Sequence, residues 1–245
     1  MKTNGLAMLV ALCAAGISTG AHAGDHKTYG AYYAWNNNFN NSAIAWSPST
    51  GAYPQWSASF NLPGGSLYGY PASIRGWHYG WNPTGDTLFP RKISTANTIP
   101  AAFSYASGGS NMVGDFAYDL FLRYDRQKST PQLEVMIWAG NNSYPIGAPI
   151  ATGVLIENGV TYDLWAGNNS AAGYYVYTFL PQRSGVPAIL PSGGSANLDI
   201  KHFFNVLRGR SFYSDSMYLD VVEAGCEITR GSGWVSTTWF SVDAR

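Results

Sequence analysis

The clearest structural signal in this chain is the run Gln132-Leu133-Glu134-Val135-Met136-Ile137-Trp138-Ala139. In an extended strand, alternate side chains point to opposite faces of a sheet. The odd-numbered positions of this run are all apolar and suit a protein core. The even-numbered face carries Glu134 beside Met136 and Trp138, a combination typical of the floor of a cleft. The alternative is a glutamate exposed beside surface aromatics.

Other segments with alternating or β-branched and aromatic content extend this pattern over most of the chain. Clusters of Gly, Pro and Asn separate them at short spacings, which is typical of an all-β sandwich or jelly roll. No linker, charge run or repeat interrupts residues 24–245, so we expect one domain there. The predicted strands span residues 28–36, 55–62, 112–124, 132–139, 159–166, 174–180, 216–228 and 235–242.

One segment shows helical spacing instead. Its apolar positions are Ile200, Phe203, Phe204 and Leu207. With Asn197 as the N-cap and a glycine stop after Arg208, this spacing predicts one amphipathic helix over 197–208, packed on the sandwich as scaffold.

The composition points to a neutral ligand. Charged residues make up 11% of the chain, aromatic residues 15%, and 14 basic residues balance 14 acidic ones. No basic field is available to bind a phosphate backbone, so nucleic acid is not an expected partner. Many Trp and Tyr beside many Asn and Gly suit a sugar polymer, because rings stack on its C–H faces and amides bind its hydroxyls.

The first 23 residues resemble an export signal. Lys2 precedes an apolar run from Leu6 to Ile17, and Ala21-His22-Ala23 forms a small-x-small cleavage site. About 12 apolar residues are too few for a membrane-spanning helix, which needs roughly 20. We therefore expect a secreted or periplasmic protein without a membrane anchor.

Disulfides, metals and cofactors are not expected. Cleavage leaves Cys226 as the only cysteine, and the remaining histidines are scattered without Cys or carboxylates at ligand spacing. His78 is interpreted as structural.

Two further strands carry acids where the apolar pattern would not place them. In the segment 219–228, Glu223, Gly225 and Glu227 share a face, and Gly225 leaves room between the two acids. In 115–122, Asp119 shares a face with Ala117 and Phe121. A carboxylate on an apolar strand is costly without a partner.

Carboxylates on neighbouring strands of a curved sheet can face one another. Repulsion and desolvation then separate their pKa values into those of an acid and a base, as cleavage of a glycosidic bond requires. A separation of about 5–5.5 Å gives retention and a wider one gives inversion, but the sequence contains no distance.

Five short motifs, in order along residues 30–242, together resemble glycoside hydrolase family 12. They are Tyr70-Pro71 with Gly76-Trp77-His78-Tyr79-Gly80, Ala117-Tyr118-Asp119-Leu120-Phe121, Glu134-Val135-Met136-Ile137-Trp138, Tyr162-Asp163-Leu164-Trp165 to Asn168 with Val176-Tyr177-Thr178-Phe179, and Ala224-Gly225-Cys226-Glu227.

This resemblance implies a jelly roll of two curved antiparallel sheets and retaining hydrolysis of internal β-1,4-glucan links. Glu134 matches the nucleophile, Glu227 the acid/base and Asp119 the acid that contacts the nucleophile. Met136 and Trp138 match cleft residues, with Trp138 expected to stack on the sugar. Asn168 falls in the motif region and is expected to bind substrate. Glu223 occupies a variable place and is treated as a neighbour that tunes Glu227.

The N-terminal part departs from the family pattern. Where the family carries a sugar-stacking Trp followed by Gly, this chain has Phe39 and no Gly. Trp35 or Phe39 could replace that platform, with Asn38 binding the sugar; the alternative is an Asn-rich turn.

We therefore predict a secreted, monomeric endo-β-1,4-glucanase acting on cellulose or a related β-glucan. Two alternatives remain open: an enzyme specific for branched xyloglucan, and a non-catalytic carbohydrate-binding jelly roll. A protein recognised by a host is a weaker third possibility that could coexist with activity.

Overall fold

The computed structural model describes residues 25–39, 43–126, 130–182 and 193–245. The expected signal peptide, residues 1–23, therefore lies outside the described residues. Among the described residues, no helix has both the length and the apolar character needed to cross a bilayer.

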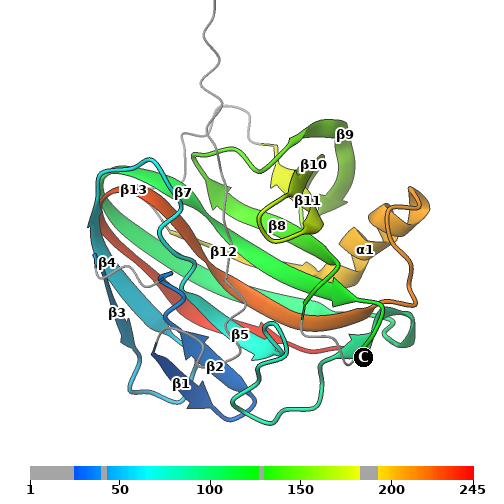
Figure 1. Cartoon of the computed structure of the whole chain (residues 1–245), viewed down its shortest axis with the longest axis horizontal. Helices are drawn as coiled ribbons and strands as arrows, with labels where there is room; N and C mark the ends of the chain where they lie inside the picture. Colours follow the sequence, from blue (N-terminus) through cyan, green and yellow to red (C-terminus); the bar gives the residue numbers. More distant parts are fainter. Residues whose placement is uncertain (1–24, 40–42, 127–129, 183–192) are drawn as a thin grey trace, which may run out of the picture.

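The described residues form strands and one α-helix (Figure 1). The strands before the first long one are β1 (His26–Tyr29), β2 (Tyr32–Trp35), β3 (Ile44–Pro48), β4 (Trp56–Leu62), β5 (Ala72–Gly76) and β6 (Arg91–Lys92). A short 3-10 helix, Ile93–Thr95, leads to β7 (Pro100–Arg123), β8 (Leu133–Asn141), β9 (Ala148–Glu157), β10 (Val160–Asn169) and β11 (Tyr174–Pro181). The chain ends with β12 (Gly194–Asp199), α1 (Ile200–Gly209) and β13 (Tyr218–Val242).

Hydrogen bonding joins these strands in the order β1-β2-β5-β13-β7-β8-β11-β10-β9, with β4 also paired to β13 and β12 to β7. The two longest strands, β7 and β13, pair with each other along most of their length and bend together. The first part of β13 pairs with β5, whereas the part from Gly231 onward pairs with β4. One continuous sheet thus folds into the two layers of a jelly roll, as the sequence predicts.

Local backbone geometry explains where the long strands bend. Register shifts flank Arg230 on β13, and such bulges bend a strand. Gly109 and Gly231 have φ values of 149° and 109° at this point, and a Cβ on Gly231 would lie 2.6 Å from the Cα of Met112. Only glycine fits this close approach.

The long strands correct several predicted strand boundaries. The predicted strands 216–228 and 235–242 are both parts of β13, and β7 begins 12 residues before the predicted start at Met112. Conversely, the predicted strand 28–36 is the β1–β2 hairpin, which turns at Gly30 with a φ of 62°. Local turn signals therefore mark bends within strands as well as the ends of strands.

The prediction of purely antiparallel sheets is wrong at one pair. Strand β11 runs parallel to β8, with Val176 opposite Glu134. The β9–β10 hairpin connects them, and it returns the chain beside β8 in the same direction.

The main core lies between the layers. It joins Phe60 of β4, Phe103 and Tyr118 of β7, and Val135 and Ile137 of β8 in one buried cluster. The apolar face predicted for residues 132–139 is therefore the core face. A second cluster, on the opposite face of the β8 sheet, includes Met136, Trp138, Phe121 and Tyr174.

The amphipathic helix packs on the core as expected, but it begins later. Phe203 contacts Phe179 and Tyr162, with ring centroids 4.9 and 5.1 Å apart. Asp199 is the N-cap, and its carboxylate accepts a hydrogen bond of 2.9 Å from the Lys201 amide. Asn197, the predicted cap, lies in β12 opposite Ala102 because its backbone is used in the sheet.

Candidate active site

Five buried carboxylates lie on the same face of the β5-β13-β7-β8-β11 sheet, the acid face. None is more than 8% exposed. They come from three adjacent strands: Asp115 and Asp119 from β7, Glu134 from β8, and Glu223 and Glu227 from β13. Strand alternation directs them away from the core, on the side of Phe121 and Met136. The acids predicted on separate strands therefore share one surface.

Strand register sets which acids are neighbours. Asp119 of β7 lies directly opposite Glu223 of β13, and Asp115 lies directly opposite Glu227. On the other side of β7, Asp119 lies opposite Met136, which places Glu134 at a diagonal position two residues away. Directly opposed side chains have Cβ atoms about 4.5–5.5 Å apart and diagonal pairs about 7–8 Å apart. Asp119 thus lies between Glu134 and Glu223.

Glu134 and Glu227 also interact with each other. Burial raises the pKa of Glu134 to about 8, and the charge of Glu227 is the next largest cause. A hydrogen bond from Tyr174 acts in the opposite direction by favouring the carboxylate. Glu134 lies on β8 and Glu227 on β13, the strands on either side of β7.

Asp115 is a further candidate site residue, which the sequence motifs do not indicate. Burial raises its pKa well above the ordinary range, and Glu227 adds to the shift by its charge and by a hydrogen bond. Burial also raises the pKa of Glu227, but the hydrogen bond to Asp115 opposes that shift. The hydrogen bond thus favours protonated Asp115 whenever Glu227 is a carboxylate. Its position four residues before Asp119 on the same strand face was the available signal.

His78 and Glu223 form a second buried pair. The His78 Nδ1 lies 2.6 Å from Glu223 Oε1, and Glu223 is fully buried. His78 comes from the loop after β5 and pairs with Trp81 in a β-bridge. His78 is therefore part of the acid face as well as a structural residue. It is hydrogen-bonded to one of the five acids, and its ring lies 5.6 Å from that of Phe121.

The aromatic and sulfur side chains beside Glu134 are the floor of the acid face. Trp138 is 1% exposed and lies opposite Ala117, while Met136 is also buried. Their position beside Glu134 agrees with the strand pattern. The expectation that Trp138 stacks on a sugar is not supported, because its ring is covered.

Trp35 reaches the acid face but is not an open platform. It is 4% exposed, and its ring packs against His78 at 4.6 Å and Trp81 at 5.5 Å. Trp81 is the more exposed ring of this group. Asn38 and Phe39 follow β2 and are half-buried; Phe39 has a φ of 50°, as in a turn. The prediction that Trp35 offers a sugar platform is not supported.

The prediction for Asn168 requires correction. Asn168 is exposed and lies opposite Tyr175 of β11, on the face that points away from the acids. The next residue, Asn169, lies opposite Tyr174, which belongs to the acid-face cluster. A shift of one residue along a strand reverses the face, so Asn169 rather than Asn168 points to the side of the acids.

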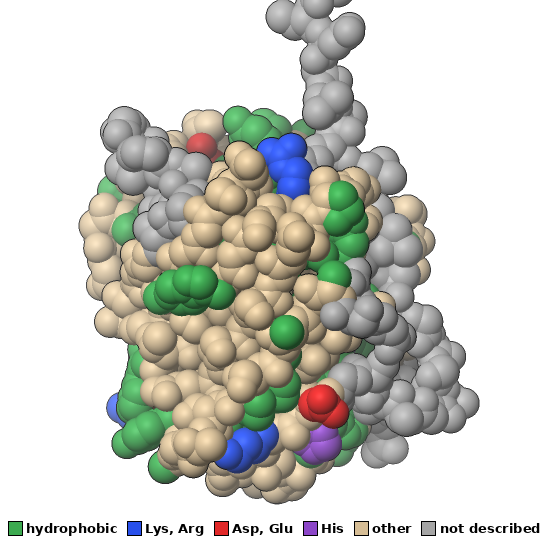
Figure 2. All heavy atoms as spheres, turned by 90° about the vertical axis from the view of Figure 1, so that its left-hand side faces the viewer, with side chains coloured by type: hydrophobic (Ala, Val, Ile, Leu, Met, Phe, Trp, Pro, Cys, Tyr) green, Lys and Arg blue, Asp and Glu red, His purple; other side chains and the backbone are tan. Residues whose placement is uncertain are grey.

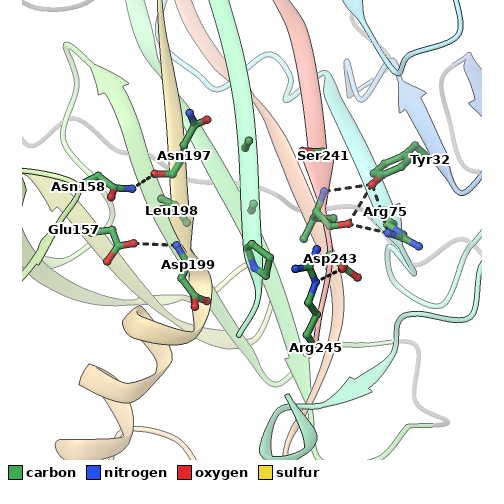
Figure 3. Close-up of a pocket in the computed structure, with 14 residues that line it drawn as sticks. Tyr32, Arg75, Glu157, Asn158, Asn197, Leu198, Asp199, Ser241, Asp243 and Arg245 are labelled. Atoms are coloured by element: carbon green, nitrogen blue, oxygen red, sulfur yellow. Dashed lines mark hydrogen bonds and ion pairs between the residues drawn. The ribbon is translucent and has the colours of Figure 1, made fainter. Parts of the chain in front are cut away.

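A hollow of about 650 Å³ lies elsewhere, between the end of β13, β12 and the β9–β10 turn (Figure 3). Its charged groups are satisfied locally: Arg75 pairs with Asp86, and Arg245 pairs with Asp243. The Tyr32 hydroxyl donates to the carbonyl of Val242. None of the five acid-face carboxylates lines this hollow.

A jelly roll with carboxylates and aromatic rings gathered on one sheet face has the features of a polysaccharide-cleaving enzyme. Residues 32–244 match the model of glycosyl hydrolase family 12. The chain belongs to this family and is a glycoside hydrolase.

Individual relatives agree with this assignment. The chain is 32% identical over 173 residues to xyloglucan-specific endo-beta-1,4-glucanase A of Aspergillus niger, covering 64% of this chain and 67% of that protein. It is 30% identical to endoglucanase S of Pectobacterium parmentieri, covering 74% and 67%.

Solved structures share the fold. A family 12 xyloglucanase from Bacillus licheniformis superposes with a TM-score of 0.76 at 24% identity, covering 92% of this chain and 99% of that one. Endoglucanase 3 of Trichoderma harzianum gives a TM-score of 0.70 at 25% identity, covering 92% and 100%.

Proposed function

We propose that this protein is an endo-β-1,4-glucanase that cleaves internal links of a β-glucan with retention of configuration. The observation that carries the proposal is the position of Glu134 and Glu227, two buried acids on one sheet face of a family 12 chain. Coupled acids can divide the roles of nucleophile and acid between them. The same arrangement disfavours a non-catalytic binding role, since five buried carboxylates destabilise a protein that has no use for them.

In the proposed reaction, the Glu134 carboxylate attacks the anomeric carbon while Glu227 transfers its proton to the departing glycosidic oxygen. The first product leaves as an alcohol, and the remaining sugar is bonded to Glu134 as an ester. Glu227, now a carboxylate, removes a proton from water, whose oxygen attacks the anomeric carbon. The ester bond breaks, Glu134 is again a carboxylate and Glu227 is again protonated.

The surrounding groups have supporting roles in this proposal. Asp119, diagonal to Glu134, holds the nucleophile in place. Tyr174 donates to Glu134 and so favours the charged form that attacks. Asp115 donates to the Glu227 carboxylate and stabilises the form that follows proton transfer.

Two substrate classes remain candidates. Plain β-glucan, such as cellulose or mixed-linkage glucan, is the broader proposal. Xyloglucan is favoured by the specificity of the Aspergillus niger relative, which is named as a xyloglucan-specific enzyme. Parallel assays on carboxymethylcellulose and xyloglucan distinguish them through the ratio of kcat/KM values.

Glu134→Gln tests the enzymatic role. The substitution keeps the shape of the side chain but removes the attacking carboxylate, so turnover should fall by about four orders of magnitude or more. Binding of a cello-oligosaccharide, measured by calorimetry, should persist. A variant that retains full turnover would exclude Glu134 as the nucleophile, and a parent that binds glucan without turnover would favour the non-catalytic alternative.

The stereochemical course tests the mechanism separately. The anomeric proton of the first product, followed by NMR before mutarotation, should show the β configuration of the substrate. An initial α product would mean direct attack by water and would overturn the double displacement.

The expectations on targeting and assembly also stand as proposals. We propose that residues 1–23 direct export, that residues 24–245 form one catalytic domain, and that the mature protein acts as a monomer on its polysaccharide. N-terminal sequencing of the secreted protein tests the first, because it should begin at Gly24.

A further inference from the structure

The sandwich has a second surface suited to binding sugar, on the side away from the acids. It is the outer face of the layer formed by β3, β4, the second half of β13 and the first half of β7. Val235 and Phe240 of this layer point into the core. Trp234 points the other way and is 45% exposed. The core therefore separates this outer face from the five carboxylates.

The Trp234 indole lies over Gly108 of the neighbouring strand. Trp234 is opposite Gly108 of β7 and Ser59 of β4. A Cβ on Gly108 would lie 2.8 Å from the indole Nε1, so the ring rests on backbone where no side chain stands. A ring supported from below with its other face open is suited to stacking on a sugar ring.

A bulge places a second tryptophan on the same face. Strict alternation from Trp234 would direct residue 239 into the core, but the register shifts between Thr237 and Trp239. Thr238 and Trp239 are consequently both exposed, while Phe240 returns to the core. Trp239 packs against Tyr53 at 4.8 Å, and Gln55, the residue before β4, donates to the carbonyl of Thr238 and supports the bulge.

The rest of this face is uncharged and rich in hydroxyl groups. None of the described residues of β3, β4, β13 from Gly231 to Val242 or β7 from Pro100 to Ser110 is Asp, Glu, Lys or Arg. Figure 2, which shows the side where β3 and β4 lie, has charged side chains only toward its margins. Exposed serines, including Ser57 and Ser59, lie between the aromatic positions. A neutral polyol matches such a face, because a charged ligand would find no partner of opposite charge there.

We propose that Trp234 and Trp239 form an accessory binding platform for a neutral β-glucan chain at the surface of an insoluble polymer. This rests on the proposed function in one respect only, the identity of the polymer. The residues of β7 opposite the two rings, Gly108 and Ser104, are four positions apart, roughly 13 Å along an extended strand. An extended chain can contact both rings at once, and the acid face, on the far side of the core, stays open to another segment.

The test measures sedimentation of the protein with microcrystalline cellulose in the Glu134→Gln background, in which the polymer is not consumed. Trp234→Ala should reduce the bound fraction at equal polymer about three- to tenfold, the range of one lost ring contact, and Trp234→Ala with Trp239→Ala further. Tyr124→Ala, which removes a ring that is 58% exposed beyond the end of β7, is the matched control and should bind as the parent does. Gly108→Ala should also weaken binding, because its methyl group lifts the indole off the sheet.

Two outcomes overturn the platform: the double variant sedimenting like its parent, or Tyr124→Ala losing as much binding. A parent that is dimeric by light scattering and becomes monomeric in Trp234→Ala would also overturn it, by assigning the face to a second copy. An assay on soluble carboxymethylcellulose, with parent and Trp234→Ala proteins that both keep Glu134, separates the accessory platform from the proposed function. Inactivity of the parent there counts against the proposed function alone, because sedimentation does not require turnover.

Discussion

At the residue scale, the unusual feature is the density of carboxyl groups around Glu134. Asp119 and Glu223 lie within the same ladder, and His78 is the one imidazole hydrogen-bonded to an acid among the described residues of this face. Negative charge on Glu223 raises the pKa of Glu134 and of Asp119. The protonation of the nucleophile is therefore set by neighbours as well as by burial.

Glu223→Gln should shift the pH profile of the enzyme. The amide keeps a partner for His78 but removes a charge that favours protonated Glu134. Since Glu134 must be a carboxylate to attack, the acid limb of kcat/KM should move to lower pH. The Asp243→Asn variant, which alters a carboxylate paired with Arg245 away from the acid face, should leave the limb unchanged. A shift of the acid limb to higher pH in Glu223→Gln would contradict this account.

At the element scale, a side-chain cap determines where α1 begins. Asp199 accepts hydrogen bonds from the amides of Lys201 and Ile99, at 2.9 and 2.7 Å, and so links the helix to the start of β7. The apolar stripe of the helix was readable in the sequence because packing depends on spacing. The start was not, because Asn197 and Asp199 are both good caps and only the pairing of β12 with β7 excludes Asn197.

Asp199→Ala should lower the free energy of unfolding by about 1–2 kcal/mol, the typical loss for an N-cap. Urea denaturation followed by tryptophan fluorescence measures this. Asp199→Asn should recover most of the loss because it retains the acceptor oxygen. Asn197→Ala serves as the control, and a loss as large as that of Asp199→Ala would mean that the cap has been assigned to the wrong residue.

At the scale of the whole molecule, the buried acids that the proposed reaction needs also reduce the stability of the fold. Burial raises the pKa of Glu134 to about 8 and that of Asp220, which pairs with Arg123, to about 7. In the unfolded chain Glu134 would release its proton near its ordinary value of 4.5. Between these values the folded protein holds more protons than the unfolded one, so raising the pH favours unfolding.

Stability should accordingly fall as the pH rises from about 4.5 to 8. Thermal unfolding across this range should show a decreasing Tm, and Glu134→Gln should flatten the decrease because an amide does not titrate. An apparent Tm that increases steadily from pH 4.5 to 8 would be incompatible with buried, proton-holding acids.

The sequence alone was sufficient to predict an all-β sandwich and the strand faces of Glu134, Asp119 and Glu227, because alternation is a local property of an extended chain. Its family motifs also located the enzyme class. The partners of those acids depended on strand register: Asp115 meets Glu227, and His78 meets Glu223, across 112 and 145 residues of chain. The burial of Trp35 and the outward turn of Trp239 likewise follow from packing and a bulge. Contacts between distant segments form only when the strands pair in the folded sheet, so the local sequence pattern cannot predict them.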